Sequence, residues 1–451
     1  MDKRKFLKTS SALIGGTLLT RLTACMPGKG HLTNWAGNYQ YSSDQVHYPD
    51  TVEDVRKIVT RFSSLRALGS RHSFNAIADS KENLVSSRNL NKILSLDKTK
   101  RTVTIEAGIK YGELVQYLQE NGFALHNLAS LPHISVAGSA ATATHGSGVK
   151  NGNLATSISG IEFVNAAGDV VALSREDGDL FNGAVVGLGA LGFVTRLTLD
   201  LLPAFTMKQV VYRNMPMEAL KENFLAILSS GYSVSLFTDW KNKNINEVWI
   251  KSRVDSQQES PSSPMEFYGA RLAEKNLHPV EDQAAESCTE QMGVPGPWFE
   301  RLPHFKMGFT PSTGKELQSE YFVPLANGYE AMMAIEKLHE KITPYLFISE
   351  IRTIDADNLW MSPCYKKACV SLHTTWKPDW KNVVKLLPQM EEQLAPFQPR
   401  PHWGKLFTLN PTVLQQRIER LGDFKELVNQ YDPLGKFQNE FLQRNVFSGQ
   451  M

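Results

Sequence analysis

The sequence predicts an α+β protein of two domains. The chain has 451 residues, of which 42% are hydrophobic and 21% are charged, an ordinary globular composition in a chain longer than one hydrophobic core usually serves. From residue 31 onward, segments with helical periodicity mix with segments that alternate like strands. The first part is rich in glycine, and near Leu202-Pro203-Ala204 it gives way to longer charged and aromatic segments. We therefore place a domain boundary there.

The first helix expected beyond residue 31 begins at Val52. Thr51 and Asp54 have the spacing of a capping box, with aspartate in place of the usual glutamate, and an apolar stripe follows over 52–62. Similar patterns predict the other elements of this part: strands over 65–68, 102–107 and 193–201, a hairpin over 161–173 that turns at 167–169, and a helix from Tyr111 to a glycine cap at Asn121-Gly122.

The first thirty residues are expected to be an export signal. Lys3-Arg4-Lys5 precedes a short apolar stretch over 11–19, and Leu22-Thr23-Ala24-Cys25 then resembles the lipobox of bacterial lipoproteins, whose cysteine is acylated. The start also resembles a twin-arginine signal, although Lys3 stands in place of the first arginine. We expect residues 1–24 to be a signal peptide and the protein to be exported, periplasmic or at the cell surface, anchored through Cys25. The alternative is a basic N-terminus with a chance cysteine.

The charge balance and the cysteines narrow the function classes. The formal net charge is +2, and loss of residues 1–24, with five basic and one acidic side chains, leaves −2; neither value suits a nucleic-acid binder. No apolar run reaches the ~20 residues of a spanning helix, so membrane contact is expected only through Cys25. Cys288, Cys364 and Cys369 lack metal-site spacing, and no metal is expected. Buried free thiols are the default, with a disulfide left open for an exported protein.

Two stretches of small residues indicate a bound cofactor. They are Gly69-Ser70-Arg71-His72-Ser73 and the loop expected over 135–148. Small residues let backbone amides approach a diphosphate closely, and serine and threonine hydroxyls add donors. Neither stretch fits the dinucleotide fingerprint or the P-loop, so nicotinamide and ATP are disfavoured. The alternative for the second stretch is a tightly packed turn, which its length argues against.

These stretches resemble the flavin-binding half of the vanillyl-alcohol oxidase type, the FAD-binding type of p-cresol methylhydroxylase (PCMH). Besides the first loop, which follows a strand, the segments 129–138 and 143–148 carry this resemblance. Later segments are similar to the alditol oxidase family, namely 232–240, 293–298, 349–353 and 401–405.

The resemblance extends from about Asn34 to Phe441 and implies a domain plan. An FAD-binding domain is expected over 31–205 and a substrate domain, with an antiparallel sheet over the flavin, over 206–399. The segment 400–451 is expected to return to the FAD-binding domain.

The same resemblance implies FAD as the cofactor, joined covalently to His72. Imidazole is a competent nucleophile for such a link; the alternative is a histidine that only hydrogen-bonds within its turn. Arg71 and Ala143 stand where relatives have glycine, and a methyl group at 143 is tolerated unless the backbone needs a positive φ. The residues implied to contact the cofactor are Ala67, Leu68, Gly69, Ser70, Arg71, His72, Ser73, Ser130, Ser135, Gly138, Thr142, Ala143, Thr144, His145 and Val194.

Glu350-Ile351-Arg352 places a carboxylate and a guanidinium on one face of a strand. From the residues alone, a solvated surface ion pair is the favoured interpretation. The resemblance instead implies that the carboxylate accepts from polyol hydroxyls while Arg352 and Lys405 stabilise an alkoxide. The proton-accepting base stays open among Lys405, Arg352 and a bound water. The implied substrate contacts are Ser130, Glu350, Arg352, His373, Thr375 and Lys405.

The implied reaction oxidises the terminal primary hydroxyl of a sugar alcohol, such as xylitol or sorbitol, to the aldose. Hydride passes to flavin N5 and oxygen is reduced to hydrogen peroxide; Ala129 matches a position where a small residue leaves oxygen a path. Three alternatives stay open. They are a polyol dehydrogenase of the same fold with a respiratory acceptor, an aldonolactone oxidoreductase, which shares the histidine loop and the segment 402–405, and a lipid-anchored polyol receptor without chemistry.

Overall fold

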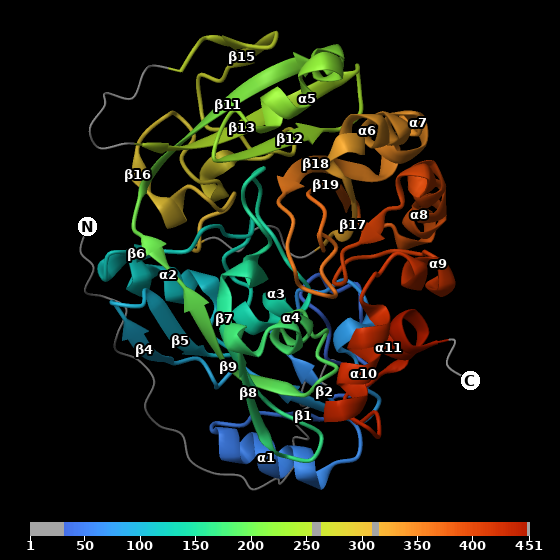
Figure 1. The fold of residues 1–451 in the computed structure, drawn as a ribbon. Coiled ribbons are helices and arrows are strands. Elements are labelled where there is room, and N and C mark those ends of the chain that lie inside the picture. The colour runs from blue at the N-terminus through green and yellow to red at the C-terminus, as the bar shows by residue number, and fades with distance from the viewer. Residues whose placement is uncertain (1–30, 255–262, 309–314, 449–451) are drawn as a thin grey trace, which may run out of the picture. The chain divides into compact units, whose positions relative to one another are not determined.

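Helices and mostly antiparallel sheets alternate along the chain, which confirms the predicted α+β class. The computed structural model describes residues 31–254, 263–308 and 315–448 (Figure 1). The expected signal peptide and Cys25 lie outside these ranges. No helix in the described ranges is long and apolar enough to cross a membrane.

A small parallel sheet lies next to helix α1 (Val52–Arg61) in the N-terminal part (Figure 1). The hydroxyl of Thr51 accepts from the backbone N–H of Asp54 at 3.1 Å, so the helix begins where the sequence predicts. Strand β2 also has the predicted bounds and leads directly into the loop that carries His72. The sheet pairs β1 (Val46–His47), β3 (Asn83–Ser86) and β2 (Leu65–Leu68) in that order.

A five-stranded antiparallel sheet completes this part, in the order β4 (Ile93–Asp97), β5 (Thr102–Glu106), β9 (Phe193–Asp200), β7 (Ile158–Val164) and β8 (Val170–Ser174). A separate pair joins β6 (Phe123–Ala124) to β10 (Leu202–Pro203). The helices here are α2 (Tyr111–Glu120), α3 (Val136–Ala141) and α4 (Asp179–Val185). Helix α3 lies inside the stretch 135–148, so the prediction of one continuous loop there is wrong. Alanine, a strong helix former, makes half of α3.

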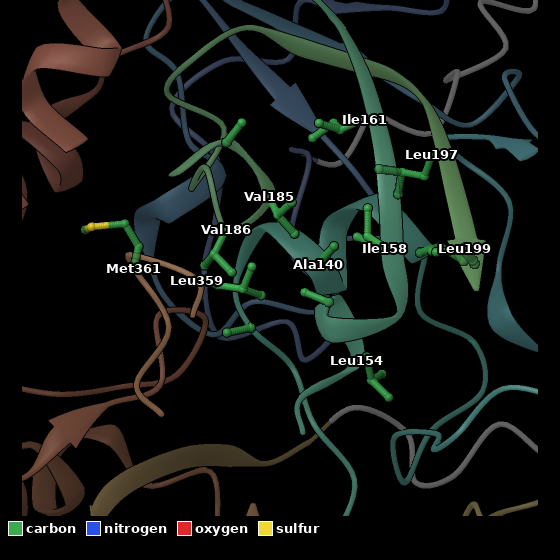
Figure 2. Close-up of a cluster of buried hydrophobic side chains, with 14 of the residues drawn as sticks. Ala140, Leu154, Ile158, Ile161, Val185, Val186, Leu197, Leu199, Leu359 and Met361 are labelled. Atoms are coloured by element: carbon green, nitrogen blue, oxygen red, sulfur yellow. The ribbon is translucent and has the colours of Figure 1, made fainter. Parts of the chain in front are cut away.

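The hydrophobic core of this part lies between the five-stranded sheet and helices α3 and α4. Figure 2 shows Ile158 and Ile161 of β7 and the alternate residues Leu197 and Leu199 of β9 in one cluster with residues of these helices. Side chains from a later segment of the chain, near residue 360, complete the cluster. The labelled members are Ala140, Leu154, Ile158, Ile161, Val185, Val186, Leu197, Leu199, Leu359 and Met361.

A ten-stranded antiparallel sheet dominates the second part (Figure 1). Its order is β14 (Glu266–Phe267), β15 (Ala270–Leu272), β11 (Thr206–Pro216), β13 (Asn244–Val254), β12 (Ser233–Thr238), β18 (Leu346–Ile354), β19 (Cys369–Trp376), β17 (Leu317–Pro324) and β20 (Arg400–Pro401). The tenth strand, β16 (Gly296–Pro297), pairs with β11.

The two faces of this sheet differ in chemistry because side chains alternate along a strand. Residues such as Tyr321, Ile351 and Leu372 join one hydrophobic cluster with the helices that cover one face. Their neighbours Glu320, Glu350 and His373 therefore lie on the opposite face, where they line a cavity. The covering helices are α5 (Leu220–Leu228), α6 (Gly328–Glu336), α7 (His339–Ile342) and α8 (Trp380–Leu394).

The segment 411–448 packs with the N-terminal part, whereas β20 belongs to the ten-stranded sheet. The backbone N–H of Leu65 in β2 donates to the carbonyl of Lys436 at 3.0 Å, and Nζ of Lys436 donates to the carbonyls of Val59 and Ala166. Figure 1 shows the C-terminal helices next to α4. They are α9 (Pro411–Gln416), α10 (Leu421–Tyr431) and α11 (Glu440–Leu442), followed by a π-helical turn (Gln443–Phe447).

Candidate active site

A cavity of about 660 Å³ lies between the small-residue loops and the polar face of the ten-stranded sheet. The structure brings to its lining every residue predicted to contact substrate and all but two of those predicted to contact the cofactor. The exceptions, Ser135 and Ala143, are buried and not part of the lining. The predicted residues that line it are Ala67, Leu68, Gly69, Ser70, Arg71, His72, Ser73, Ala129, Ser130, Gly138, Thr142, Thr144, His145, Val194, Glu350, Arg352, His373, Thr375 and Lys405.

Ser135, Gly69 and Gly138 form a close contact between the two small-residue stretches. A Cβ atom would lie 2.8 Å from Oγ of Ser135 if added at Gly69 and 2.7 Å from it if added at Gly138. Both distances are shorter than real contacts, so a larger residue at either position would displace the Ser135 hydroxyl from its place between the two glycines. Oγ of Ser135 is buried without a hydrogen-bond partner among the described residues. A cradle with free backbone approach and an unpaired hydroxyl fits the diphosphate of FAD.

The imidazole of His72 stacks on the indole of Trp35, with ring centroids 4.9 Å apart and planes 24° from parallel. Burial lowers the pKa of His72 to about 3, and the positive charge of Lys405 acts in the same direction. The ring is therefore neutral at physiological pH, so one nitrogen carries a free lone pair.

Arg71 and Ala143 both adopt left-handed backbone conformations, with φ of 63° and 52°. The methyl group of Ala143 was expected to be tolerated only if the backbone there did not need a positive φ. The backbone does have a positive φ, so this residue is strained. The guanidinium of Arg71 donates to the carbonyl of Thr33 at 2.9 Å, which offsets part of the strain at that residue. At Ala143 the chain accepts a conformation that costs about 1–2 kcal/mol for a residue with a Cβ atom.

Arg352 is held between two carboxylates on the polar sheet face. Nη2 donates to Oε1 of Glu320 at 2.9 Å, and Nε lies 3.5 Å from Oε1 of Glu350. All three residues are buried, with 1–6% of their surface exposed. The interpretation of Glu350 and Arg352 as a solvated surface pair is therefore wrong, because the alternation of β18 turns both side chains into the cavity.

The neighbouring strands add polar groups at matching positions. His373 of β19 pairs with Glu320 of β17 on one side and with Glu350 of β18 on the other. Its Nε2 lies 3.2 Å from Oε1 of Gln318, and the same amide oxygen accepts a hydrogen bond from Nζ of Lys405. Acceptors and cations thus alternate across the cavity wall.

Burial and neighbouring charges set the protonation states of this group. Burial acts to raise the pKa of both carboxylates, but His145 and Arg352 hold that of Glu320 well below its usual value, and Arg352 does the same for Glu350. Burial lowers the pKa of Lys405 to about 8, against the opposing effect of Glu320. At neutral pH the wall therefore presents two carboxylates and two cations.

Sequence reasoning missed several groups of this wall, above all Gln318, Glu320 and His304. Gln318 and Glu320 stand two residues apart in β17 and so share one strand face, which is a signal for the first two. His304 lies outside regular strands and has no such signal. Its Nε2 is 2.7 Å from Oε1 of Glu350.

The remaining predicted groups have simpler surroundings. Cys288, Cys364 and Cys369 are buried free thiols, as expected by default. His126 and His133 contact the backbone carbonyls of Gly152 and Met307, at 3.3 and 2.9 Å.

Two family models match the chain. One, described as an FAD binding domain, covers residues 43–174, and the other, described as D-arabinono-1,4-lactone oxidase, covers residues 309–445. The cholesterol oxidase of B. sterolicum has a similar structure, with a TM-score of 0.74 at 16% identity over 92% of this chain and 96% of that one. Together with the FAD-binding match, this likeness confirms the predicted two-domain flavoprotein fold.

Full-length relatives share the sequence as well. An alditol oxidase from Streptomyces sp. is 46% identical over 93% of this chain and 99% of that protein. Mouse L-gulonolactone oxidase is 24% identical over 91% of this chain and 97% of that protein. The L-gulono-1,4-lactone dehydrogenase of Mycobacterium tuberculosis is 25% identical over 91% of this chain and 98% of that protein. Identity to the alditol oxidase is nearly twice that to these two lactone enzymes.

Proposed function

Because the chain belongs to the alditol oxidase family of FAD-dependent oxidoreductases, we propose that it oxidises the terminal primary hydroxyl of sugar alcohols such as xylitol and sorbitol to the aldose. The observation that carries this proposal is the buried wall of alternating acceptors and donors formed by Glu320, Glu350, Arg352 and Lys405. An open-chain polyol carries a hydroxyl on every carbon, and each buried hydroxyl needs a partner. A wall of this kind supplies them.

The cofactor is held by the loops that face this wall. The cradle around Ser135, Gly69 and Gly138 suits the diphosphate, and His72 lies in the same lining. When bound, FAD accepts the hydride that leaves the carbinol carbon. The protein must supply orientation, charge stabilisation and a path for the hydroxyl proton.

Arg352 and Lys405 act as cations at the reacting oxygen. Burial acts to lower the pKa of Arg352, but Glu350 and Glu320 outweigh it and raise this pKa above its usual value. Arg352 therefore keeps its proton and stabilises the developing alkoxide as a donor; it is not the base. Nη1 of Arg352 lies 3.5 Å from Oγ of Ser130, which keeps both groups directed at the same region of the cavity.

Attachment of FAD through His72 is part of this proposal. The neutral, buried imidazole and its stack on Trp35 support it, because a nucleophilic nitrogen must be both unprotonated and fixed in direction. A covalent tether also raises the oxidising power of a flavin.

Oxygen is the proposed electron acceptor, with hydrogen peroxide as the product. Ala129 lines the cavity with 8% of its surface exposed, and its small side chain supports a path for oxygen. In a dehydrogenase that uses a respiratory acceptor, the flavin absorbance would bleach with polyol but would recover only slowly in air.

A second candidate is an aldonolactone oxidoreductase, favoured by the lactone oxidase model that matches residues 309–445. That match includes Glu320, Glu350, Arg352, His373 and Lys405, so the same wall would then contact a lactone ring. The substrate distinguishes the two candidates, since a lactone would react where an open polyol does not.

Export with a lipid anchor at Cys25 is also proposed, on the basis of the lipobox-like segment 22–25. Cys25→Ala should move the protein from the membrane fraction to the soluble fraction while leaving polyol oxidation unchanged. Wild-type protein found only in the cytoplasm would contradict this proposal.

The experiment that tests the function adds xylitol to the purified protein without oxygen and then with it. Bleaching of the visible flavin band, followed by rapid recovery in air with peroxide, is expected. Protein that bleaches only with an aldonolactone would favour the second candidate. Protein that binds polyols but carries no flavin would favour a receptor without chemistry.

A further inference from the structure

A lysine is buried behind the substrate wall, and each N–H group of its ammonium donates a hydrogen bond. Lys251 of β13 has only 1% of its surface exposed. Its ammonium donates to the carbonyl of Leu302 at 2.5 Å, to the carbonyl of Pro303 at 3.1 Å and to Nδ1 of His304 at 3.0 Å. An ammonium has three N–H groups, so these three acceptors satisfy it completely.

This contact fixes the tautomer of His304. Nδ1 accepts from Lys251, so the ring proton must lie on Nε2, 2.7 Å from Oε1 of Glu350. Burial lowers the pKa of His304 to about 4, and the charge of Lys251 acts in the same direction, so the ring is neutral. The rings of Phe237 and Trp249 meet it edge-on at 5.5 and 5.1 Å, which fixes its plane.

This tautomer determines how His304 interacts with Glu350. Because Nε2 carries the ring proton, His304 donates a hydrogen bond to the carboxylate and cannot accept one from it. Oε1 of Glu350 is the oxygen that faces both His304 and Nε of Arg352. Among the described residues, none donates a hydrogen bond to Oε2 of Glu350. The Glu350 side chain lines the cavity. A hydrogen-bond chain that runs from Lys251 through His304 therefore holds one oxygen of the carboxylate and leaves the other for a ligand.

We propose that Lys251 and His304 are positioning residues that orient Glu350, so that its free oxygen accepts a hydrogen bond from a hydroxyl of the substrate. This inference rests on the proposed polyol oxidation and adds a specificity device to it. A carboxylate kept ionised accepts hydrogen bonds and cannot donate them, so it selects hydroxyl donors at this place.

The negative charge of Glu350 favours the charged form of Lys251. Burial lowers the pKa of Lys251 to about 7; Glu350 acts to raise this pKa, and the positive charge of Arg352 acts to lower it further. Cys288, the other group near this ammonium, has a pKa that burial holds near 12, so it stays a neutral thiol. Assays are therefore made below pH 7, where Lys251 is charged and the chain is complete.

The test compares Lys251→Met, His304→Phe and His304→Gln by steady-state kinetics with xylitol. The first two variants break the chain with side chains of similar size. We expect each to raise KM about tenfold with kcat within about threefold, because Glu350 would then lose alignment with a hydroxyl that is bound equally in the ground and transition states. The amide of His304→Gln keeps an N–H donor that reaches Glu350, and it should restore KM to within about threefold of wild type.

Lys436→Met is the matched control. Lys436 also donates to two backbone carbonyls, of Val59 at 2.8 Å and Ala166 at 2.7 Å, but it does not line the cavity. This variant should lower Tm without changing KM.

Two results would overturn the inference, and they are distinct. If wild type turns over xylitol and neither Lys251→Met nor His304→Phe changes KM, the chain has no positioning role even if both variants lose stability. If no polyol reduces the wild-type flavin, the proposed function itself fails and the role of the chain fails with it. Should Lys251→Met not fold, the pair of variants at His304 decides the question alone.

Discussion

Nη2 of Arg352 in β18 donates to Oε1 of Glu320 in β17 at 2.9 Å, although β19 lies between these two strands in the sheet. The same carboxylate oxygen lies 3.0 Å from Nε2 of His145, a residue of the small-residue stretch on the cofactor side. Glu320 thus joins the wall that faces the substrate to the loop that faces the cofactor. A change at this carboxylate should therefore affect how the cation at the reacting oxygen is placed.

Glu320→Gln should slow flavin reduction by polyol roughly 10- to 100-fold while FAD stays bound. A neutral amide keeps the shape but weakens a hydrogen bond to a charged partner, worth ~1.5–3 kcal/mol. Arg352 would then turn toward Glu350. Stopped-flow reduction under anaerobic conditions measures the effect.

The matched control is Glu391→Gln. Glu391 is also buried and accepts from Tyr321 at 2.8 Å and from Thr408 at 2.6 Å, but it does not line the cavity. It should lose stability and keep its reduction rate. Equal rates in the Glu320 variant and wild type would exclude Glu320 from the mechanism.

The reduction rate should fall as pH rises through about 8. Burial holds the pKa of Lys405 at about 8, below its ordinary value, so the lysine loses its charge there and no longer stabilises the alkoxide. Folding stability changes with pH in the opposite direction. Between pH 8 and the ordinary lysine pKa, Lys405 is protonated more in the unfolded chain than in the folded protein, so this group makes stability rise with pH. Lys405→Arg keeps its charge and should remove the alkaline fall in rate. A wild-type rate that is flat to pH 10 would contradict the assignment.

Local patterns predicted the parts of the site that are close in sequence. The strand at 65–68 leads into the His72 loop, and the alternation of Glu350 with Arg352 puts both side chains on one face. The resemblance to known oxidases, rather than the pattern itself, then favoured a buried role over a surface ion pair.

Contacts between distant segments were not predictable in this way. Glu320 reaches Arg352 only through the register of β17, β19 and β18. Lys251 meets His304 because a loop 53 residues later in the chain packs against β13. Such pairings depend on tertiary packing, for which periodicity carries no signal. The helix α3 was missed for a related reason, since small residues suit both a loop and a short helix.

Ala143→Gly should leave the protein more stable than Ala140→Gly by roughly 1–2 kcal/mol. Both variants lose one buried methyl group and gain the same freedom in the unfolded chain. Ala140 lies within helix α3, whereas Ala143 has a φ of 52° that glycine adopts without strain. Thermal unfolding of the two holoenzymes measures the difference. Equal Tm values would show that the left-handed backbone at 143 costs nothing.

His72→Ala should give protein whose flavin stays in the supernatant after acid precipitation, while flavin of wild type stays with the pellet. Trp35→Ala should lower the covalently bound fraction because the imidazole would lose the ring that fixes its direction. Trp35→Phe keeps an aromatic partner and serves as the control. Colour retained in the pellet of His72→Ala would place the attachment elsewhere.

Ala129→Val should slow reoxidation of the reduced enzyme at least tenfold, with little change in its reduction by polyol. Ala129 lines the cavity and is nearly buried, so two added methyl groups would narrow the path of oxygen without reaching the charged wall formed by Glu350, Arg352 and Lys405. Reduction under anaerobic conditions is the internal control, since a distorted site would slow both half-reactions. A variant that reoxidises at the wild-type rate would show that oxygen reaches the flavin by another route. Slow reoxidation already in wild type would instead identify a dehydrogenase, for which a respiratory acceptor restores turnover.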